Sequence, residues 1–541
     1  MSKIFEQLLK KRHFDQDFLC PKYEAGIDPF SLVDMDKAIE RTKTAIQNHE
    51  KILVYGDYDV DGVTASAAMA ESLVNAGLKP NRIEIMLPDR FADGYGMSPK
   101  LIKRAKAFKA TLVITVDCGS RNHGIIEELN ELGIDTIVTD HHETDNDMPN
   151  ALAIINPHRK DHPTESLQNL AGVGIVFKFA EALTKANLIK NGQEKWLLDL
   201  VLLGTICDSM LLTGENRRLG YYGIKVLEKT RRPGLAELMS RAGVKHLDSE
   251  SIGFQIGPRL NAAGRLDTAD LALNLIRSES PIDAAPIAEK LEQLNKKRKA
   301  EQTLAIRDIE KRGIGDDPVI VETGHWHEGI LGIVAGRLVE EYLRPAFVLT
   351  ETTNGVFKGS ARSFGDFNLA NALDSVKDSI ISGGGHAGAA GVKIERENLF
   401  KFREQINDYY RSLNLKNQAD YLRQHADLEL TDFSEIDLNL LEELKQLEPF
   451  GPENEEPIFR LKNVYLSGVT RMGNDRNHLR LDLHDKNGKY LKLVAFFAPE
   501  KWLSLDPADP ELKIEPLVKL TENDFNGIKS VEARICDIII L

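Results

Sequence analysis

Three aspartates at alternate positions follow a short apolar run near the start of the chain. The run covers residues 52–55, and the aspartates are Asp57, Asp59 and Asp61. Such a run predicts a buried strand, and the two-residue spacing keeps the three carboxylates close together. Carboxylates this close repel one another unless a cation lies between them, and Mg²⁺ and Mn²⁺ prefer oxygen ligands of this kind. The segment therefore predicts a metal site, with an acidic, solvated turn as the alternative.

Two later apolar runs end in side chains of the same kinds. The first leads into Asp117, and the second leads into Asp140, His141 and His142. A pair of histidines alone is more often a surface feature, but this pair follows a predicted buried strand. The carboxyl ends of parallel strands meet at one crevice, so we expect the fold to bring all these side chains together.

The elements that must position these residues alternate between strand and helix. Strands are predicted over residues 52–55, 83–87, 112–116, 134–138 and 152–155. Helices are predicted between them over residues 64–76, 98–108 and 122–132. Ser98 and Pro99 supply an N-cap and a first-turn proline, and Gly133 supplies a helix stop. This alternation predicts an α/β fold with a parallel sheet covered on both faces.

Length and composition limit the possible classes of protein. A chain of 541 residues is too long for one core, so several domains are expected. The net charge of −14 argues against a uniformly basic nucleic-acid coat, although a local basic channel remains possible. No long apolar stretch predicts a signal peptide or membrane span, so we expect a cytoplasmic protein without membrane contact. Four scattered cysteines predict neither a disulfide framework nor a zinc site.

The second half of the chain predicts further modules. Residues 281–311 form a long, polar helical pattern that we expect to bridge two domains, and a second α/β module follows it. Short strands broken by turn residues from about residue 425 onward predict a small β-barrel. Residues 460–492 hold eight Lys or Arg against three Asp, with aromatic residues between them. Basic residues interleaved with aromatics suit the binding of unpaired bases.

Several motifs together resemble the DHH phosphoesterase superfamily, and within it the bacterial single-stranded-DNA-specific exonucleases. The resemblance covers nearly the whole chain. It rests on these stretches of sequence: Asp57-Tyr58-Asp59-Val60-Asp61-Gly62, Leu87-Pro88-Asp89-Arg90 with Gly94-Tyr95-Gly96, Val116-Asp117-Cys118-Gly119, Asp140-His141-His142, Gly204-Thr205-Ile206-Cys207-Asp208, Gly257-Pro258-Arg259-Leu260-Asn261-Ala262-Ala263-Gly264-Arg265-Leu266 and Ser382-Gly383-Gly384-Gly385-His386-Ala387-Gly388-Ala389-Ala390-Gly391.

The resemblance implies two divalent metal ions, Mn²⁺ or Mg²⁺. It divides six ligands between them, with Asp57 and Asp59 on one ion, Asp61, His141 and Asp208 on the other, and Asp117 as the bridge. Taken alone, an aspartate such as Asp208 after a buried segment is usually a helix end. His142 is expected to face the phosphate as a charge stabiliser or proton donor, and Asp140 to orient His141.

Three later segments have compositions that favour phosphate binding. The first is a predicted glycine-proline turn near residue 257, the second a run of hydroxyl and guanidinium groups near residue 360, and the third a predicted glycine loop with bare N–H groups near residue 384. A structural turn is the alternative for the first and the third segments. The resemblance implies that Ser360, Arg362 and Ser363 hold a 5′-terminal phosphate. The full set of candidate phosphate or DNA ligands is Arg259, Asn261, Arg265, Ser360, Arg362, Ser363, Gly384, Gly385 and His386.

The resemblance also implies an order of domains. We expect a helical lead-in over residues 1–50, a DHH domain over 51–280, a connecting helix over 281–312, a DHH-associated domain over 313–415, and an OB-like nucleic-acid-binding domain over 425–541.

The function implied is a metal-dependent 5′→3′ exonuclease that hydrolyses single-stranded DNA to 5′ mononucleotides in DNA repair and recombination. One alternative is a phosphodiesterase of short oligonucleotides, cyclic dinucleotides or pyrophosphate, and another is a non-catalytic DNA-binding scaffold. The expected partners are single-stranded DNA, a single-stranded-DNA-binding protein and a helicase, and the expected state is a monomer.

Overall fold

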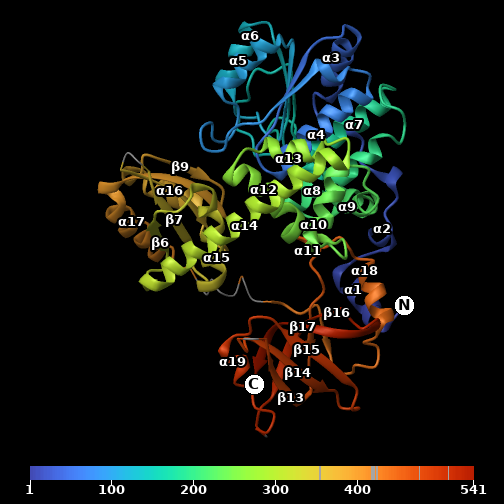
Figure 1. Cartoon of the computed structure of the whole chain (residues 1–541), viewed down its shortest axis with the longest axis vertical. Helices are drawn as coiled ribbons and strands as arrows, with labels where there is room; N and C mark the ends of the chain where they lie inside the picture. The colour runs from blue at the N-terminus through green and yellow to red at the C-terminus, as the bar shows by residue number, and fades with distance from the viewer. Residues whose placement is uncertain (353–354, 416–420, 422–423, 474, 510) are drawn as a thin grey trace. The chain divides into compact units, whose positions relative to one another are not determined.

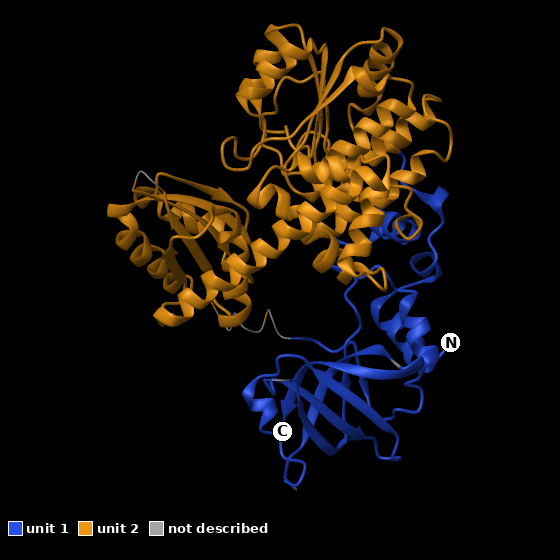
Figure 2. Cartoon of the chain, viewed as in Figure 1, with its two compact units in different colours: residues 1–28, 209–225, 424–541 blue, residues 29–208, 226–423 orange. Residues whose placement is uncertain are grey.

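The computed structural model describes residues 1–352, 355–415, 421, 424–473, 475–509 and 511–541. Within these residues the chain forms two compact units (Figure 2). Unit 1 combines residues 1–28, 209–225 and 424–541, and unit 2 combines residues 29–208 and 226–423.

Unit 2 begins with the parallel sheet that the sequence predicts. Its five strands lie in the order β2-β1-β3-β4-β5, and every neighbouring pair is parallel. In chain order they are β1 (Ile52–Tyr55), β2 (Ile83–Met86), β3 (Leu112–Val116), β4 (Asp135–Thr139) and β5 (Ala153–Ile155).

Helices cover both faces of this sheet (Figure 1). On one face Leu53, Val113 and Val138 pack into a core with α5 and α6, as their alternation along the strands requires. The other face is covered by α3, α4 and α7. The bounds of these helices are α3 (Met35–Gln47), α4 (Val60–Asn75), α5 (Pro99–Phe108), α6 (His123–Glu131) and α7 (Gly172–Lys185).

A group of helices follows the sheet. In unit 2 its members are α8 (Leu198–Cys207), α10 (Pro233–Ala242), α11 (Ser249–Ser251), the π-helix η6 (Ile252–Ile256), α12 (Gly257–Leu266), α13 (Asp270–Ile276) and α14 (Pro281–Arg312). The helix α9 (Gly214–Leu227) follows α8 in the chain but belongs mostly to unit 1. The predicted long helix is therefore confirmed as α14, but the predicted turn at Gly257 and Pro258 is wrong. These two residues instead continue a helical segment that runs from α11 through η6 into α12, and the Gly257 N–H donates to the Ile252 carbonyl in the π-helical pattern.

A second α/β module completes unit 2. Its sheet has the order β6-β7-β8-β10-β9, with β6 and β7 parallel and the other pairs antiparallel. The predicted glycine loop is wrong, because residues 382–385 form the edge strand β9. The elements are β6 (Ile320–Gly324), α15 (Leu331–Tyr342), β7 (Ala346–Glu351), β8 (Val356–Arg362), α16 (Leu369–Ser375), β9 (Ser382–Gly385), β10 (Ala389–Glu395) and α17 (Leu399–Ser412).

Unit 1 is built on a seven-stranded sheet of order β11-β12-β16-β17-β15-β14-β13 around one apolar core. The predicted C-terminal β domain is thus present. Its strands are β11 (Leu428–Leu430), β12 (Phe459–Leu461), β13 (Tyr465–Met472), β14 (His478–His484), β15 (Tyr490–Ala495), β16 (Ile514–Phe525) and β17 (Ile528–Ile540), and its helices are α1 (Lys3–Arg12), α2 (Gln16–Leu19), α18 (Leu438–Lys445) and α19 (Glu500–Leu503).

The first helix of the chain belongs to this C-terminal domain. Phe5 and Leu8 of α1 lie in the core of the seven-stranded sheet, and Arg12 forms an ion pair of 2.7 Å with Asp427. The segment of residues 209–225 joins the same unit, where the Arg217 guanidinium donates to backbone carbonyls of residues 446–448.

In the described part of the chain, no helix has the length and apolar character needed to cross a membrane.

The packing of α10 against the end of α13 in unit 2 can be tested by substitution. A methyl group at Gly234 would lie 1.8 Å from the Leu275 carbonyl oxygen, so backbone would have to move. We expect Gly234→Ala to lower the free energy of unfolding by about 3 kcal/mol, measured by urea unfolding of unit 2. The matched control is Gly124→Ala in α6, where a methyl group meets nothing within 4 Å and should stabilise by about 0.5–1 kcal/mol. Equal effects of the two variants would contradict the packing described here.

Candidate metal centre and phosphate cavity

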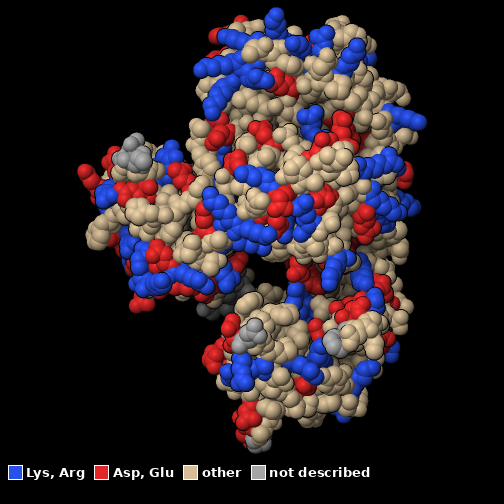
Figure 3. Space-filling model, in the orientation of Figure 1, with Lys and Arg blue, Asp and Glu red and all other residues tan. Residues whose placement is uncertain are grey.

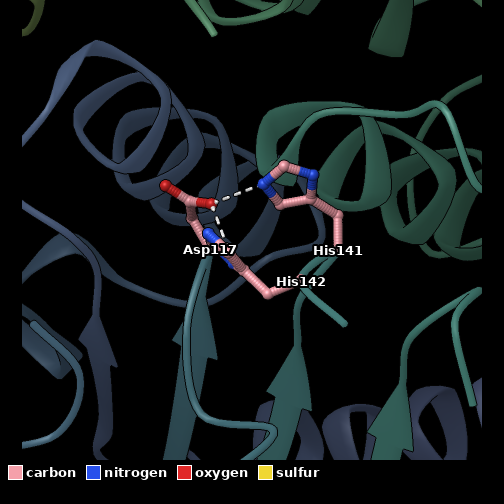
Figure 4. Close-up of side chains that lie close together, drawn as sticks. All are labelled: Asp117, His141 and His142. Atoms are coloured by element: carbon pink, nitrogen blue, oxygen red, sulfur yellow. Dashed lines mark ion pairs between the residues drawn. The ribbon is translucent and has the colours of Figure 1, made fainter. Parts of the chain in front are cut away.

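The carboxyl ends of β1, β3 and β4 bring the predicted acidic and imidazole side chains to one place. Three groups of possible ligand atoms each lie within 4.8 Å of one another. They are Asp57, Asp59 and Asp117; Asp61, His141 and Asp208; and Asp117, His141 and His142. Figure 4 shows the last group, with Asp117 and the two histidines projecting beyond the strand ends. All six predicted metal ligands therefore meet at this edge.

The first helix after β1 fixes two of these carboxylates. Asp59 is the N-cap of α4, and its side chain accepts the Gly62 N–H at 3.0 Å. Asp61 lies in the first turn of the same helix and accepts the N–H groups of Gly172 and Val173 at 2.6 and 2.9 Å. These two amides open α7, so the positive end of that helix faces the Asp61 carboxylate.

Asp117 occupies the centre of the group. Its φ of +60° is unusual for a residue with a side chain, and it directs the carboxylate over the end of the sheet. One carboxylate oxygen lies 3.1 Å from His141 Nε2 and 3.9 Å from His142 Nδ1. A methyl group at Gly172 would lie 2.6 Å from the Asp117 Cβ, so α7 packs directly behind this side chain.

The electrostatics of the site indicate a place for cations. Burial and neighbouring carboxylates raise the pKa of Asp57 to about 8 and that of Asp208 to about 7. Burial and neighbouring carboxylates also raise the pKa values of Asp61 and Asp117 well above their ordinary range. One buried oxygen each of Asp57 and Asp117 accepts no hydrogen bond from the described residues. Unpartnered buried oxygens among mutually repelling carboxylates fit hard divalent cations, which would remove the repulsion.

The two histidines have opposite electrostatic environments. Burial and the neighbouring His142 lower the pKa of His141 to about 3, so its ring is neutral and able to bind a metal. Burial also opposes the charge on His142, but the hydrogen bond of 2.8 Å to Asp140 outweighs it and raises the pKa of His142 to about 9. At neutral pH the site therefore combines a neutral imidazole with an imidazolium.

Asp140 orients a different histidine from the one that the sequence predicts. Its carboxylate binds the ring of His142, whereas His141 offers it only a backbone N–H at 2.8 Å. The Ser120 N–H donates to the second oxygen at 3.0 Å. Burial would raise the pKa of Asp140, but the hydrogen bond and charge of His142 outweigh it and hold this pKa well below its usual range. Asp140 is thus a permanent anion beneath the His142 ring.

A cavity of about 400 Å³ lies beside the metal centre and is lined by residues of both modules of unit 2. Two of the predicted phosphate ligands, Ser360 and Gly384, line this phosphate cavity. Arg265 and Arg362 are both partly buried. Desolvation and the nearby charge of Arg90 lower the pKa of both guanidinium groups, to about 9 for Arg265. The fold therefore gathers positive charge where an anion would bind.

The other predicted ligands lie elsewhere. The Arg259 guanidinium pairs with Glu292 of α14 at 2.6 Å, and Asn261 lies half-buried on α12. The Ser363 hydroxyl donates to the Phe367 carbonyl at 2.8 Å. Gly385 pairs with Ala390 in the sheet, and the exposed His386 begins the connection to β10.

Most residues that line the phosphate cavity are absent from the predicted set, including the polar side chains of Tyr58, Arg90, Lys358 and Lys393. Tyr58 stands between two predicted ligands, and Arg90 ends a motif to which no role was given. Lys358 precedes Ser360 by two positions on β8, and so shares its side of the strand. That period-two spacing was a usable signal for Lys358, whereas Lys393 reaches the cavity only through the pairing of β10 with β8.

Comparisons with known proteins agree with this architecture. Residues 51–205 match the DHH family, N-terminal domain, residues 316–412 the DHHA1 domain, and residues 426–537 the RecJ OB domain. The single-stranded-DNA-specific exonuclease RecJ of Bacillus subtilis is 34% identical over 550 residues, covering 99% of this chain and 68% of that protein. RecJ of Escherichia coli is 32% identical over 94% of this chain and 90% of its own length. The crystal structure of Thermus thermophilus RecJ with Mn²⁺ is similar with a TM-score of 0.84, 27% identity and coverage of 99% and 75%, and a second with Mg²⁺ has a TM-score of 0.76.

The pair of Asp140 and His142 predicts a pH dependence in the metal-free protein. The pKa of His142 is raised from its ordinary 6.5 to about 9, so the pair stabilises the fold fully below pH 6.5. This contribution, on the order of 3 kcal/mol, is lost as the pH rises through 9. We expect Asp140→Asn to return the His142 pKa toward 6.5, as measured by NMR titration of the imidazole protons. The control is Asp145→Asn, which removes an exposed carboxylate near Arg121. An unchanged His142 pKa in Asp140→Asn would refute the assignment.

Proposed function

Because the chain belongs to the RecJ family of single-stranded-DNA-specific exonucleases, we propose that it hydrolyses single-stranded DNA from the 5′ end and releases 5′ mononucleotides. One observation carries the proposal: six carboxylate and imidazole ligands meet at the edge of the parallel sheet beside a cavity with a positively charged wall. This combination suits a metal-dependent phosphodiester hydrolase.

The cofactors are two divalent cations, Mn²⁺ or Mg²⁺. We assign Asp57 and Asp59 to one ion, Asp61, His141 and Asp208 to the other, and Asp117 to both. When bound, such ions activate a water molecule and neutralise the charge of the scissile phosphate. The protein must hold five mutually repelling carboxylates close together. At Asp61, the amides at the start of α7 stabilise the carboxylate by hydrogen bonds.

His142 supplies a proton and a positive charge. Its pKa of about 9 keeps the ring protonated at neutral pH, and Asp140 holds Nδ1 from below. Release of a 5′ mononucleotide requires the bond between phosphorus and the 3′ oxygen to break. We assign two roles to His142: its positive charge stabilises the oxygens of that phosphate, and it donates a proton to the departing 3′ oxygen. The remaining strand then carries a new 5′ phosphate.

The phosphate cavity determines the polarity in this proposal. Lys358, Ser360 and Lys393 reach it from the DHHA1 module, and Arg90 reaches it from the DHH module. Such groups favour a terminal phosphate, which carries more negative charge than a phosphodiester. On the visible face of each unit, Lys and Arg alternate with Asp and Glu (Figure 3), so the strand is selected by cations inside the cavity more than by a basic outer coat.

The RecJ OB domain binds single-stranded DNA in this scheme, and its basic and aromatic residues suit unpaired bases. Action on DNA in repair and recombination would place the protein in the cytoplasm, with a single-stranded-DNA-binding protein and a helicase as partners and a monomer as the working state. No comparison favours a phosphodiesterase of small substrates or a non-catalytic scaffold.

End-labelled single-stranded DNA tests chemistry and polarity together. With Mn²⁺ we expect the 5′ label to appear first as a mononucleotide, while the 3′ label stays in long strands. Chelation of the metal or Asp117→Ala should abolish release, whereas the control Asp145→Asn should not. Loss of the 3′ label first would reverse the polarity. Cleavage of dinucleotides but not of long strands would replace the proposal with the small-substrate alternative.

Arg362 provides a test of the terminal-phosphate assignment. We expect Arg362→Ala to reduce the preference for a 5′ phosphate over a 5′ hydroxyl, expressed as a ratio of kcat/KM values, by about ten- to a hundred-fold, because a charge-assisted contact is lost. Arg337→Ala removes an exposed guanidinium from α15 and serves as the control. A full phosphate preference in Arg362→Ala would remove this residue from the phosphate site.

A further inference from the structure

Two more cavities lie next to the phosphate cavity or to one another, because neighbouring cavities share lining residues. The first, which we call the aromatic cavity, has a volume of about 300 Å³ and is lined by Phe91, Trp326, His327, Glu328, Thr350 and Glu351. It shares Phe91 and Glu328 with the phosphate cavity. The next, of about 380 Å³, shares Trp326 and Glu351 with the aromatic cavity. The shared walls place the three spaces in series, beginning at Tyr58 beside the metal centre.

Trp326 forms a fixed wall of the aromatic cavity. A methyl group at Gly324 would lie 2.4 Å from the indole ring, so the ring packs against bare backbone at the end of β6. The backbone N–H of Trp326 donates to the Thr350 hydroxyl at 3.2 Å, which fixes the backbone from which the ring projects. The Arg312 guanidinium lies 5.6 Å from the ring centre. A ring held in this way offers a flat surface whose position is set before any ligand arrives.

Phe91 and His327 form another part of the lining. Their rings meet edge to face, with centres 5.5 Å apart and an angle of 85°. His327 Nδ1 accepts the Gly329 N–H at 3.0 Å, so the ring is held from one side and the neutral form carries its proton on Nε2. The cavity thus combines flat apolar surface with a hydrogen-bond donor and with acceptor oxygens of Thr350 and Glu351.

Charge distinguishes the aromatic cavity from the phosphate cavity. Its two carboxylates are paired, Glu328 with Lys358 at 3.3 Å and Glu351 with Arg396. The phosphate cavity contains the same Glu328 and Lys358 pair but adds Arg90 and Lys393. The first space therefore suits an anion, and the second suits a neutral, flat group with polar edges.

We propose that the aromatic cavity binds the nucleobase of the 5′-terminal nucleotide, with the phosphate of the same nucleotide in the phosphate cavity. This inference rests on the proposed function. The sugar alone separates the phosphate of a nucleotide from its base, so a base whose phosphate is held must enter a neighbouring space. The aromatic cavity adjoins the phosphate cavity through Phe91 and has the surface that stacks on bases.

Binding at this site accepts any base. Stacking on aromatic rings tolerates all sequences because every base has a π face, as an exonuclease working along a strand requires. The site also positions the leaving nucleotide. When its base and its 5′ phosphate are each held in a cavity, the linkage between this nucleotide and the next one is directed at the metal centre. Phe91 and Trp326 are therefore substrate-binding residues in this scheme.

An abasic 5′-terminal nucleotide tests the site directly. The substrates are two 5′-phosphorylated single strands, one with a normal first nucleotide and one with tetrahydrofuran in its place. For the unaltered protein with Mn²⁺ we expect loss of the base to lower kcat/KM for the first cleavage by about five- to a hundred-fold. Phe91→Ala and Trp326→Ala should lower kcat/KM on the normal strand and have little further effect on the abasic strand. Trp326→Phe should restore most of the base dependence.

The control is Phe400→Ala, which removes an exposed phenyl ring from α17 and should leave the base dependence intact. Phe91 is partly exposed, so its variant tests the site even where Trp326→Ala disturbs packing. If the unaltered protein cleaves both strands equally, or if Phe91→Ala slows both by the same factor, the aromatic cavity does not hold this base. If neither strand loses its 5′ nucleotide in any variant, the proposed exonuclease function itself is wrong.

Discussion

Electrostatic repulsion among buried carboxylates is the constraint on which this structure depends. Asp57, Asp61, Asp117 and Asp208 meet at the edge of one parallel sheet, and burial with mutual charge raises the pKa of each. Hydrogen bonds from the start of α7 offset part of this cost at Asp61. Divalent cations bound at this edge would relieve the remaining cost, and their binding would then be coupled to folding of the edge.

The same edge also separates charges by role. His141 is kept neutral by burial, and His142 is kept protonated by Asp140, although the two residues are adjacent in the chain. Two imidazole groups thus have different protonation states because their surroundings differ, and this suits them to different chemical roles. The second module of unit 2 continues this separation, because it adds cations to the phosphate cavity and neutral aromatic surface to the space beside it.

The sequence predicts the strands of the first sheet well, because each is a short apolar run closed by polar residues. The candidate ligands Asp57, Asp59, Asp61, Asp117 and His141 were predicted for the same reason, since they follow those runs closely. Their role as metal ligands remains a proposal. Two glycine-rich segments were predicted wrongly. Gly257 and Pro258 lie in a helical segment, and residues 382–385 form an edge strand. Glycine permits many backbone conformations, so tertiary packing decides among them. Gly257 illustrates this, because it lies where a methyl group would meet the Cys207 sulfur at 2.5 Å.

What the sequence determined by itself was therefore the set of chemical groups: the aspartates and histidines at strand ends, and the family to which their spacing belongs. Only the tertiary structure decided their partners. It joined Asp140 to the ring of His142 and not to His141, paired Arg259 with Glu292, and brought Arg90 toward Arg265 and Arg362. The physical reason is the distance along the sequence over which each kind of information acts. Periodicity encodes which residues share a strand end or a helix face, whereas contacts between distant segments depend on how whole elements pack against one another.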